Sequence, residues 1–226
     1  MTRSVRRNRL SVVGLAAAAL AMIGCAGSPD AAPHGAFETL FDGRSLDGWV
    51  QRGGEAVYFV EDGAIVGETR PNQPNSFLCT ARTYRDFDLE LEFLIDPELN
   101  SGIQIRSLSR DEGGREIVYG YQVEIDPSER GWTAGIYDES RRGWLYPLDD
   151  NPAAREAFRP GDWNHLRILA EGPHIRTWLN GIPAADLTDD MTPEGFIGLQ
   201  VHGVGARTEP LQVRWRNIRL RELGGS

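Results

Sequence analysis

The sequence predicts an all-β domain, folded as an antiparallel β-sandwich or jelly roll. Short runs in which apolar and polar residues alternate fill the chain after residue 36, as in strands with one buried face. Gly, Pro, Asn and Asp separate these runs at the short intervals typical of all-β domains. Only 152–158 has a helical pattern. At 226 residues and 40% hydrophobic content, the chain is long enough for one large domain with a sizeable core.

The alternating runs predict about ten strands joined by short turns. Asp62-Gly63 and Asn180-Gly181 each lie between two apolar runs, and such pairs mark tight hairpins. The predicted strands, in chain order, are 56–60, 64–67, 87–93, 103–106, 119–126, 134–137, 166–170, 175–179, 196–202 and 213–220.

Residues 1–24 have the layout of an export signal. A basic stretch, 1–9, precedes an apolar run that is too short to span a bilayer. Residues 22–25 read Met-Ile-Gly-Cys and resemble the lipobox of bacterial lipoproteins, so we expect Cys25 to be acylated. This predicts an exported protein, lipid-anchored to a bacterial membrane in the periplasm or at the cell surface, with 25–36 as a tether. An ordinary signal peptide with an incidental cysteine is the alternative.

Composition narrows the classes of partner. The chain has 24 arginines, no lysine and 33 acidic residues, for a formal net charge of −9. Phosphate binding needs a basic footprint, so nucleic acid is excluded as a partner. If Cys25 is acylated, Cys79 is the one remaining cysteine and no internal disulfide forms. Cys79 lies in an apolar, strand-like run at 76–80, which indicates a buried structural thiol rather than a nucleophile.

The strand at 119–126 carries the clearest chemical signal. Its apolar residues alternate with Gln122, Glu124 and Asp126, which therefore share one face. Neutral side chains would suit a solvated face equally well, so an amide and two carboxylates in line suggest a site. The alternative is the ordinary solvated face of an antiparallel sheet.

Neighbouring strands carry matching polar faces. If these faces line one concave sheet, their amides, arginine, histidine and carboxylates suit sugar hydroxyls, and nearby aromatic rings suit the C–H face of a pyranose. The converging side chains are Gln104, Arg106, Gln122, Glu124, Asp126, Gln200 and His202, and the aromatic candidates are Trp132, Tyr137 and Trp144. No cluster of metal-binding residues has zinc-like spacing, so we expect no cofactor and no transition metal. A structural calcium ion on carboxylates stays an open alternative.

Eight segments resemble, in order, the 3-keto-disaccharide hydrolase family over 37–223. They are 40–49 (LFDGRSLDGW), 60–67 (VEDGAIVG), 100–103 (NSGI) with Arg106, 120–126 (GYQVEID), 161–164 (GDWN), 178–181 (WLNG), 198–202 (GLQVH) and 216–218 (RNI). The resemblance implies a concanavalin A-like lectin/glucanase jelly roll. It also implies cleavage of 3-keto-glycosides, which a separate sugar 3-oxidoreductase would produce.

The implied chemistry is an elimination. A ketone at carbon 3 acidifies the carbon-2 proton, a base removes it, the bond at carbon 1 breaks, and water adds afterwards. We predict His202 as the base, because an imidazole titrates near neutrality, with Glu124 as the second choice. Arg106 would hold the carbon-3 oxygen as the enolate charge develops. Gln122 and Asp126 would orient hydroxyls.

Two other functions fit parts of the sequence. Glu124 and Glu129 match the E-x-D-x-x-E pattern of retaining glucanases, in which they would be nucleophile and acid/base. In a regular strand, however, residues five apart point to opposite faces, so Glu129 would share the face of Glu124 only across a bulge. The third reading is a non-catalytic carbohydrate-binding domain tethered to the membrane. Such a domain would bind a glycoside and leave it intact.

Overall fold

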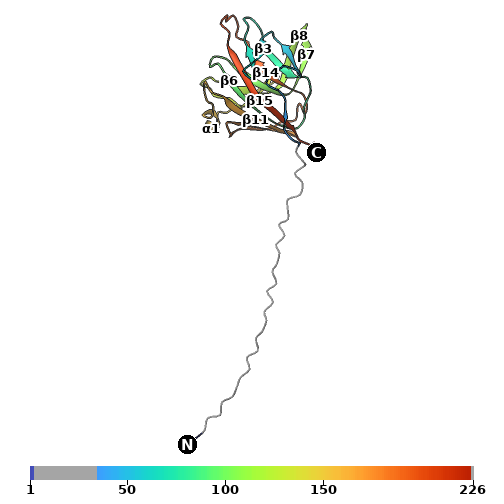
Figure 1. Ribbon diagram of the computed structural model, residues 1–226. Helices are drawn as coiled ribbons and strands as arrows, with labels where there is room; N and C mark the ends of the chain where they lie inside the picture. Colours follow the sequence, from blue (N-terminus) through green and yellow to red (C-terminus); the bar gives the residue numbers. More distant parts are fainter. Residues whose placement is uncertain (3–34, 225–226) are drawn as a thin grey trace. The chain divides into compact units, whose positions relative to one another are not determined.

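The computed structural model describes residues 1–2 and 35–224. The predicted signal peptide, Cys25 and most of the predicted tether lie outside the described residues. The chain divides into two units, Met1–Ala31 and Ala32–Ser226, and the described part of the second unit is a β-domain of two antiparallel sheets (Figure 1). This confirms the predicted fold class. Within the described part, no helix is long and apolar enough to cross a membrane.

Sheet A has eight strands, in the order β13-β12-β11-β6-β15-β4-β3, with β1 paired to β15. Every pairing in it is antiparallel. Its strands are β1 (Glu38–Thr39), β3 (Val57–Glu61), β4 (Ala64–Glu68), β6 (Phe87–Ile95), β11 (Asn164–Glu171), β12 (His174–Leu179), β13 (Ile182–Thr188) and β15 (Gln212–Glu222).

Sheet B has seven strands, in the order β10-β9-β8-β7-β14-β5-β2. Because β14 comes late in the chain yet pairs with both β7 and β5, it brings C-terminal residues beside the central strands. The strands are β2 (Trp49–Gly53), β5 (Ser76–Thr80), β7 (Ser101–Glu112), β8 (Arg115–Ile125), β9 (Ile136–Glu139), β10 (Gly143–Tyr146) and β14 (Phe196–Val201).

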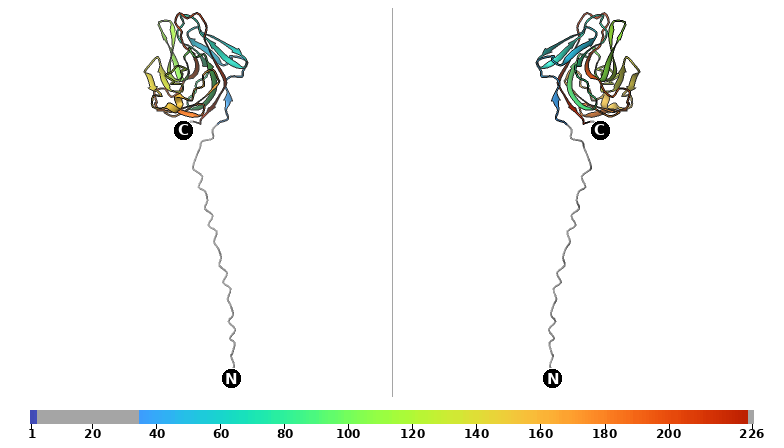
Figure 2. Two further views of the ribbon diagram at one scale, coloured as in Figure 1. Left: turned by 90° about the vertical axis from the view of Figure 1, so that its left-hand side faces the viewer. Right: turned by 90° about the vertical axis from the view of Figure 1, so that its right-hand side faces the viewer.

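One hydrophobic core joins the inner faces of the two sheets. Two further views show the strands of the domain from its sides (Figure 2). Alternate residues of β6 are buried, among them Leu89, Leu91 and Phe93 of sheet A. Sheet B contributes Val123 and Ile125 from β8, both fully buried. Each such side chain stabilises the fold by roughly 1.5–3 kcal/mol relative to an exposed one.

Both predicted hairpin turns are present. Asp62 and Gly63 join β3 to β4 with φ angles of 50° and 74°, and Asn180 and Gly181 join β12 to β13 with 50° and 83°. Two consecutive left-handed residues form the turn that matches the twist of paired strands, and Asn, Asp and Gly tolerate this conformation best. The predicted helix is shorter than expected. It is α1 (Pro152–Arg155), whose first turn is capped by the Asn151 side chain.

Candidate functional site

A cavity of about 280 Å³ lies on the face of sheet B opposite the core. Residues of β8, β9, β10 and the end of β14 meet there because these strands are neighbours in the sheet or lie close to its centre. We call this cavity the polar cavity. Its lining residues are Asn75, Asn100, Gln122, Glu124, Arg130, Tyr137, Glu139, Trp144 and His202.

Glu124 is held at the base of the polar cavity by amide donors. Asn100 donates to its Oε1 at 2.6 Å and Gln122 donates to its Oε2 at 2.8 Å. Gln122 is itself fixed by Gln104, whose Nε2 donates to the Gln122 Oε1 at 2.6 Å, and Ser107 donates to Gln104 in turn. Burial raises the pKa of Glu124, although the hydrogen bonds from Asn100 and Gln122 oppose the shift.

Glu139 is a second carboxyl group in the same cavity. It lies at the end of β9, where Asn75 donates to its Oε1 over a long 3.3 Å. Burial raises the pKa of Glu139, and the nearby His202 and the Asn75 hydrogen bond only partly offset this. A partly buried carboxyl with a raised pKa and weak hydrogen bonds can hold and release a proton.

His202 follows directly after β14 and is exposed at the mouth of the polar cavity. Its Nδ1 lies 2.8 Å from the carbonyl oxygen of Gly203. A carbonyl oxygen only accepts, so in the neutral ring Nδ1 carries the hydrogen and Nε2 keeps a free lone pair. Asn75 accepts from the backbone N–H of Gly203 at 3.0 Å, which links the His202 turn to Glu139 through one amide side chain.

Arg130 supplies a cation to the polar cavity. Its guanidinium lies 4.7 Å from the ring centre of Trp132 and 5.0 Å from that of Trp144. Its Nε donates to Asp126 at 2.7 Å, and its Nη2 is 3.7 Å from Glu124. Hydrogen bonds from Ser128 and Arg130 hold the pKa of Asp126 below its usual value although burial raises it. Asp126 therefore positions Arg130, whose guanidinium also contacts two indole rings that meet edge to face at 78°.

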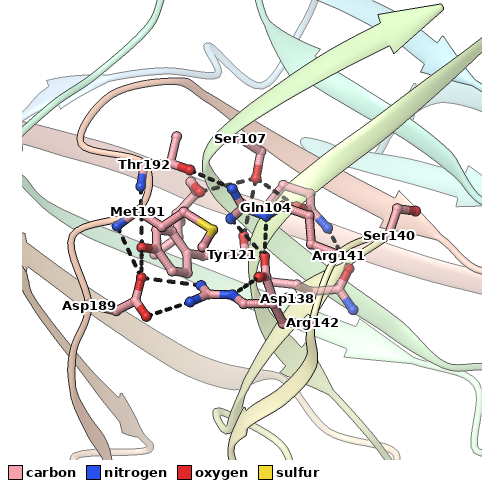
Figure 3. Close-up of polar contacts among 12 residues, drawn as sticks. Gln104, Ser107, Tyr121, Asp138, Ser140, Arg141, Arg142, Asp189, Met191 and Thr192 are labelled. Carbon is pink, nitrogen blue, oxygen red and sulfur yellow. Dashed lines mark hydrogen bonds and ion pairs between the residues drawn. The ribbon is translucent and has the colours of Figure 1, made fainter.

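Ion pairs brace the hairpin of β9 and β10 against the rest of the domain (Figure 3). Asp138 on β9 is fully buried and pairs with Arg142 and, at 2.8 Å, with the Nε of Arg141. Arg142 also makes two hydrogen bonds to Asp189, at 2.8 and 3.2 Å, and Asp189 accepts from the hydroxyl of Tyr121. Because this hairpin carries three residues that line the polar cavity, the network fixes one wall of the site.

The prediction that Arg106 lies in the ligand site is wrong, because Arg106 does not line the polar cavity. The register of β7 against β8 shifts after Ile105, and Arg106 itself has a left-handed φ of 44°. Such a bulge reverses the strict alternation of faces on which the prediction relied. The Arg106 side chain is 1% exposed, pairs with Asp86 at 2.7 Å, and donates to the carbonyl oxygens of Arg85 and Gly172. It holds loops together.

Four other predicted residues lie around the cavity rather than in its lining. Gln104 and Gln200 are fully buried, so neither can contact a bound sugar, and the amide of Gln200 has no hydrogen-bond partner among the described residues. Asp126 and Trp132 instead contact Arg130, the first through an ion pair and the second through its ring. Gln122, Glu124, Tyr137, Trp144 and His202 do line the polar cavity.

The pairing of Glu124 with Glu129 fails on geometry. Glu129 is exposed in the segment after β8 and lines a separate depression with Arg155 and Phe158. A retaining glucanase needs both carboxyls at one bond, roughly 5–5.5 Å apart. The structure therefore gives no support to that alternative.

Four residues that line the polar cavity were not predicted from the sequence, namely Asn75, Asn100, Arg130 and Glu139. Asn75 and Arg130 come from loops, whose direction no periodic pattern predicts. Glu139 shares a strand face with Tyr137, two residues earlier, and this alternation was a usable signal. Among residues 35–224, no group of three or more His, Cys, Asp or Glu side chains is arranged to hold a metal ion.

The family described as 3-keto-alpha-glucoside-1,2-lyase-like domain matches residues 36–221, which confirms the resemblance seen in the sequence. No protein of curated function matches the chain. A candidate glycosyl hydrolase from Parabacteroides distasonis ATCC 8503 is similar in fold, with a TM-score of 0.60, 18% identity, and coverage of 83% of this chain and 94% of that one.

Two Bacillus subtilis structures share the fold as well. The carbohydrate binding module CBM66 has a TM-score of 0.51, 18% identity, and coverage of 76% of this chain and 93% of that one. A protein of unknown function with a galectin-like fold has a TM-score of 0.56, 11% identity, and coverage of 78% and 90%. At these identities the structures show the fold alone, while the family match indicates a carbohydrate-related function.

Proposed function

Because the chain belongs to the 3-keto-alpha-glucoside-1,2-lyase-like domain family, we propose that its polar cavity binds 3-keto-glycosides and cleaves them by elimination. The observation that carries this proposal is the meeting of four kinds of group in one cavity. An imidazole with a free lone pair, a carboxyl with a raised pKa, an arginine and two aromatic rings line it together.

The reaction breaks two bonds of the sugar and leaves the oxidation level unchanged. A base takes the proton from carbon 2, and the electron pair delocalises onto the carbon-3 oxygen as an enolate. The carbonyl at carbon 3 then re-forms, a double bond forms between carbons 1 and 2, and the bond from carbon 1 to the leaving oxygen breaks. The leaving oxygen takes a proton from an acid. Water adds across the double bond in a later step.

His202 is the base in this assignment. Its Nδ1 is engaged with the carbonyl of Gly203, so Nε2 is the nitrogen that accepts the carbon-2 proton. Its exposed position at the cavity mouth lets the proton pass on to solvent after each turnover.

Glu139 is the acid. Its raised pKa favours the protonated form, and its hydrogen bonds with Asn75 and Ser140 are long at 3.3 Å each. Glu124 is tied down more firmly, since each of its oxygens accepts a short amide hydrogen bond. Each carboxylate oxygen has room for a second donor, so Glu124 accepts hydrogen bonds from sugar hydroxyls.

Arg130 replaces Arg106 as the group that stabilises the enolate oxygen. Its guanidinium stays charged throughout and is oriented by Asp126 and by two indole rings. Trp144 and Tyr137 lie 5.3 Å apart edge to face, and their rings suit the C–H face of the sugar.

The proposal implies one reaction that supplies the substrate, one that consumes the product, and a cellular location. An oxidoreductase must supply the carbon-3 ketone, and hydration must consume the unsaturated product. We also propose export and lipid anchoring through Cys25, which rest on the leader sequence alone.

Incubation of the protein with 3-keto-trehalose and with trehalose tests the function. We expect loss of the keto sugar, release of glucose, and no change in trehalose. Mass spectrometry measures all three. If the carbon-2 proton leaves reversibly, keto sugar that is recovered from deuterated water before the reaction is complete should carry deuterium at carbon 2. If the proton leaves irreversibly, substrate deuterated at carbon 2 should react more slowly, with a primary isotope effect. Binding of the keto sugar without any turnover would instead establish a carbohydrate-binding domain.

A further inference from the structure

One amide side chain joins the proposed acid to the turn that carries the proposed base. The Nδ2 of Asn75 donates to the Oε1 of Glu139 at 3.3 Å, and its Oδ1 accepts from the backbone N–H of Gly203 at 3.0 Å. The carbonyl oxygen of Gly203 in turn accepts from Nδ1 of His202. Because the N–H of Gly203 only donates, the oxygen of the Asn75 amide must face it and the nitrogen must face Glu139. Both ends of the amide are therefore engaged, in one orientation.

The backbone of Asn75 is fixed by close packing. Asn75 lies directly before β5 and is partly buried, and its carbonyl oxygen accepts from the N–H of Gly54 at 2.9 Å. A Cβ atom at Gly53 would come within 2.7 Å of the same carbonyl oxygen, so this close approach depends on glycine. The Asn75 side chain thus projects from backbone that has little room to move.

The turn after β14 packs against the same loop. A Cβ atom at Gly203 would come within 2.6 Å of the carbonyl oxygen of Gln73, and the N–H of Asn72 donates to the carbonyl oxygen of Gly205 at 2.6 Å. Backbone therefore lies directly on backbone where the loop before β5 meets the turn after β14. Because His202 begins this turn, its position depends on the position of that loop.

Strand pairing does not fix the distance between Glu139 and His202. Glu139 ends β9 and His202 follows β14, and β8 and β7 lie between these two strands in sheet B. An elimination needs both groups at one sugar, the base at the carbon-2 proton and the acid at the oxygen on carbon 1. A misplacement of about 1 Å can cost roughly 10²-fold in rate. The Asn75 amide bridges the two groups directly.

The Asn75 amide also acts on the titration of Glu139. Burial raises the pKa of Glu139 and the neighbouring Asp138 adds to the rise, whereas the hydrogen bond from Asn75 and the nearby His202 lower the pKa. A donor to the charged form favours ionisation. The amide therefore helps Glu139 to release its proton and also holds the carboxyl group in place.

We propose that Asn75 is a positioning residue that holds the acid Glu139 and the base His202 at a fixed separation. This inference rests on the proposed function, since it concerns the acid and the base of the same site. Asn75 acts through these two residues rather than through the sugar. Its substitution should therefore lower kcat and leave KM nearly unchanged.

Two substitutions separate the two hydrogen bonds of the amide. Asn75→Ala removes both, and we expect kcat on 3-keto-trehalose to fall by roughly 10²-fold. Asn75→Asp keeps the oxygen that faces Gly203 and replaces the donor to Glu139 with an oxygen. Two adjacent carboxyl groups share one proton, so the pair gives it up at a higher pH than Glu139 alone. We expect kcat of Asn75→Asp to be low at neutral pH and to recover, relative to the wild type, as the pH falls and the new carboxyl group becomes a donor. A merely destabilised fold would not recover in this way.

NMR measurements follow the two hydrogen bonds themselves. Carboxyl NMR should show a raised apparent pKa of Glu139 in both variants. Amide hydrogen exchange at Gly203 should be faster by about fivefold or more in Asn75→Ala, because its N–H loses an acceptor, and close to the wild-type rate in Asn75→Asp.

Asn72→Asp is the matched control for Asn75→Asp. It adds a carboxylate at an exposed position of the same loop, where the left-handed φ of 58° is one that Asp tolerates. It should leave kcat and the pKa of Glu139 unchanged. Wild-type kcat in Asn75→Ala, or a loss confined to KM, would overturn the positioning role of Asn75.

Failure of the proposed function gives a different result. If the wild-type protein leaves the keto sugar intact, the NMR titration and the amide exchange still report on Asn75. A raised apparent pKa of Glu139 in both variants, with faster exchange at Gly203 only in Asn75→Ala, would support a residue that holds the two groups in a binding protein. Unchanged titration and exchange would reject it independently of catalysis. Because Asn75→Asp keeps the size of the native side chain, the test stands even where Asn75→Ala does not fold.

Discussion

Gln122 and Glu124 are joined by a 2.8 Å hydrogen bond from the amide of the first to the carboxylate of the second. The other end of the Gln122 amide accepts from Gln104, so both of its ends are engaged by the protein. Gln122 is thus a positioning residue for Glu124, and its contact with sugar hydroxyls stays a prediction. The two residues act as one unit.

Gln122→Ala should therefore change the titration of Glu124. Loss of a donor to the charged form raises the pKa of Glu124 further, and the carboxylate loses its fixed direction. We expect kcat to fall about tenfold or more, with an upward shift in the pKa of Glu124 followed by carboxyl NMR. Gln212→Ala is the matched control, because it removes a partly buried glutamine that is hydrogen-bonded to Glu68 in sheet A. It should leave kcat and the pKa of Glu124 unchanged. An effect on KM alone would show that Gln122 binds substrate directly.

His202→Ala should lower kcat/KM on a 3-keto-glycoside by roughly 10²- to 10⁴-fold, as expected for loss of a general base. His174→Ala is the matched control, because His174 is exposed at the start of β12 in sheet A. Both variants should unfold at the wild-type temperature. Full activity in His202→Ala would move the role of base to Glu124.

Substitution of Arg130 should mainly lower activity, whereas substitution of Arg106 should mainly lower stability. Arg130→Ala removes the cation of the polar cavity, so we expect a kcat loss of roughly 10²-fold, similar to the loss of one oxyanion donor. The buried Asp126 loses one partner but keeps the hydrogen bond from Ser128, so the loss of stability should be smaller than in Arg106→Ala. Arg106→Ala leaves Asp86 without its buried partner and should lower the free energy of unfolding by about 3 kcal/mol or more. The folded fraction of Arg106→Ala should keep its turnover number. Activity per folded molecule, measured beside calorimetric unfolding, distinguishes the two roles.

Asp189 makes stability depend on pH below about 4. Burial raises its pKa, but hydrogen bonds from Arg142 and Tyr121 outweigh this and lower the pKa to about 2. Because the folded-state pKa lies below the unfolded value of about 3.9, the stabilisation is present above pH 4 and is lost as the pH falls towards 2. It amounts to about 1–2 kcal/mol, since solvent screens a partly exposed ion pair. Asp189→Asn should lower the free energy of unfolding at pH 7 and flatten its decline between pH 4 and 2, measured by urea unfolding across that range.

Cys25→Ser tests the membrane anchor that the leader predicts. In a bacterium that processes lipoproteins, we expect the wild-type protein in the membrane fraction and the variant in the soluble exported fraction. Metabolic labelling with a fatty acid should mark only the wild type. Membrane retention of the unlabelled variant would argue against acylation.

The sequence by itself determined the local structure and the family. Alternation of apolar and polar residues depends only on neighbouring positions, so it correctly predicted most strands, the two hairpins and the shared face of Gln122 and Glu124. The family follows from motifs that occur in the same order over nearly the whole domain, and their order is a property of the chain alone.

The tertiary structure alone decided which polar groups meet. A bulge after Ile105 turns Arg106 away from the site, and no local pattern marks that register shift. Loop and hairpin positions bring Arg130 and Glu139 in, through an ion-pair network that joins residues far apart in the chain. Face and register are set by pairing between distant strands, and this is why the fold could be predicted while four of the nine residues that line the polar cavity could not.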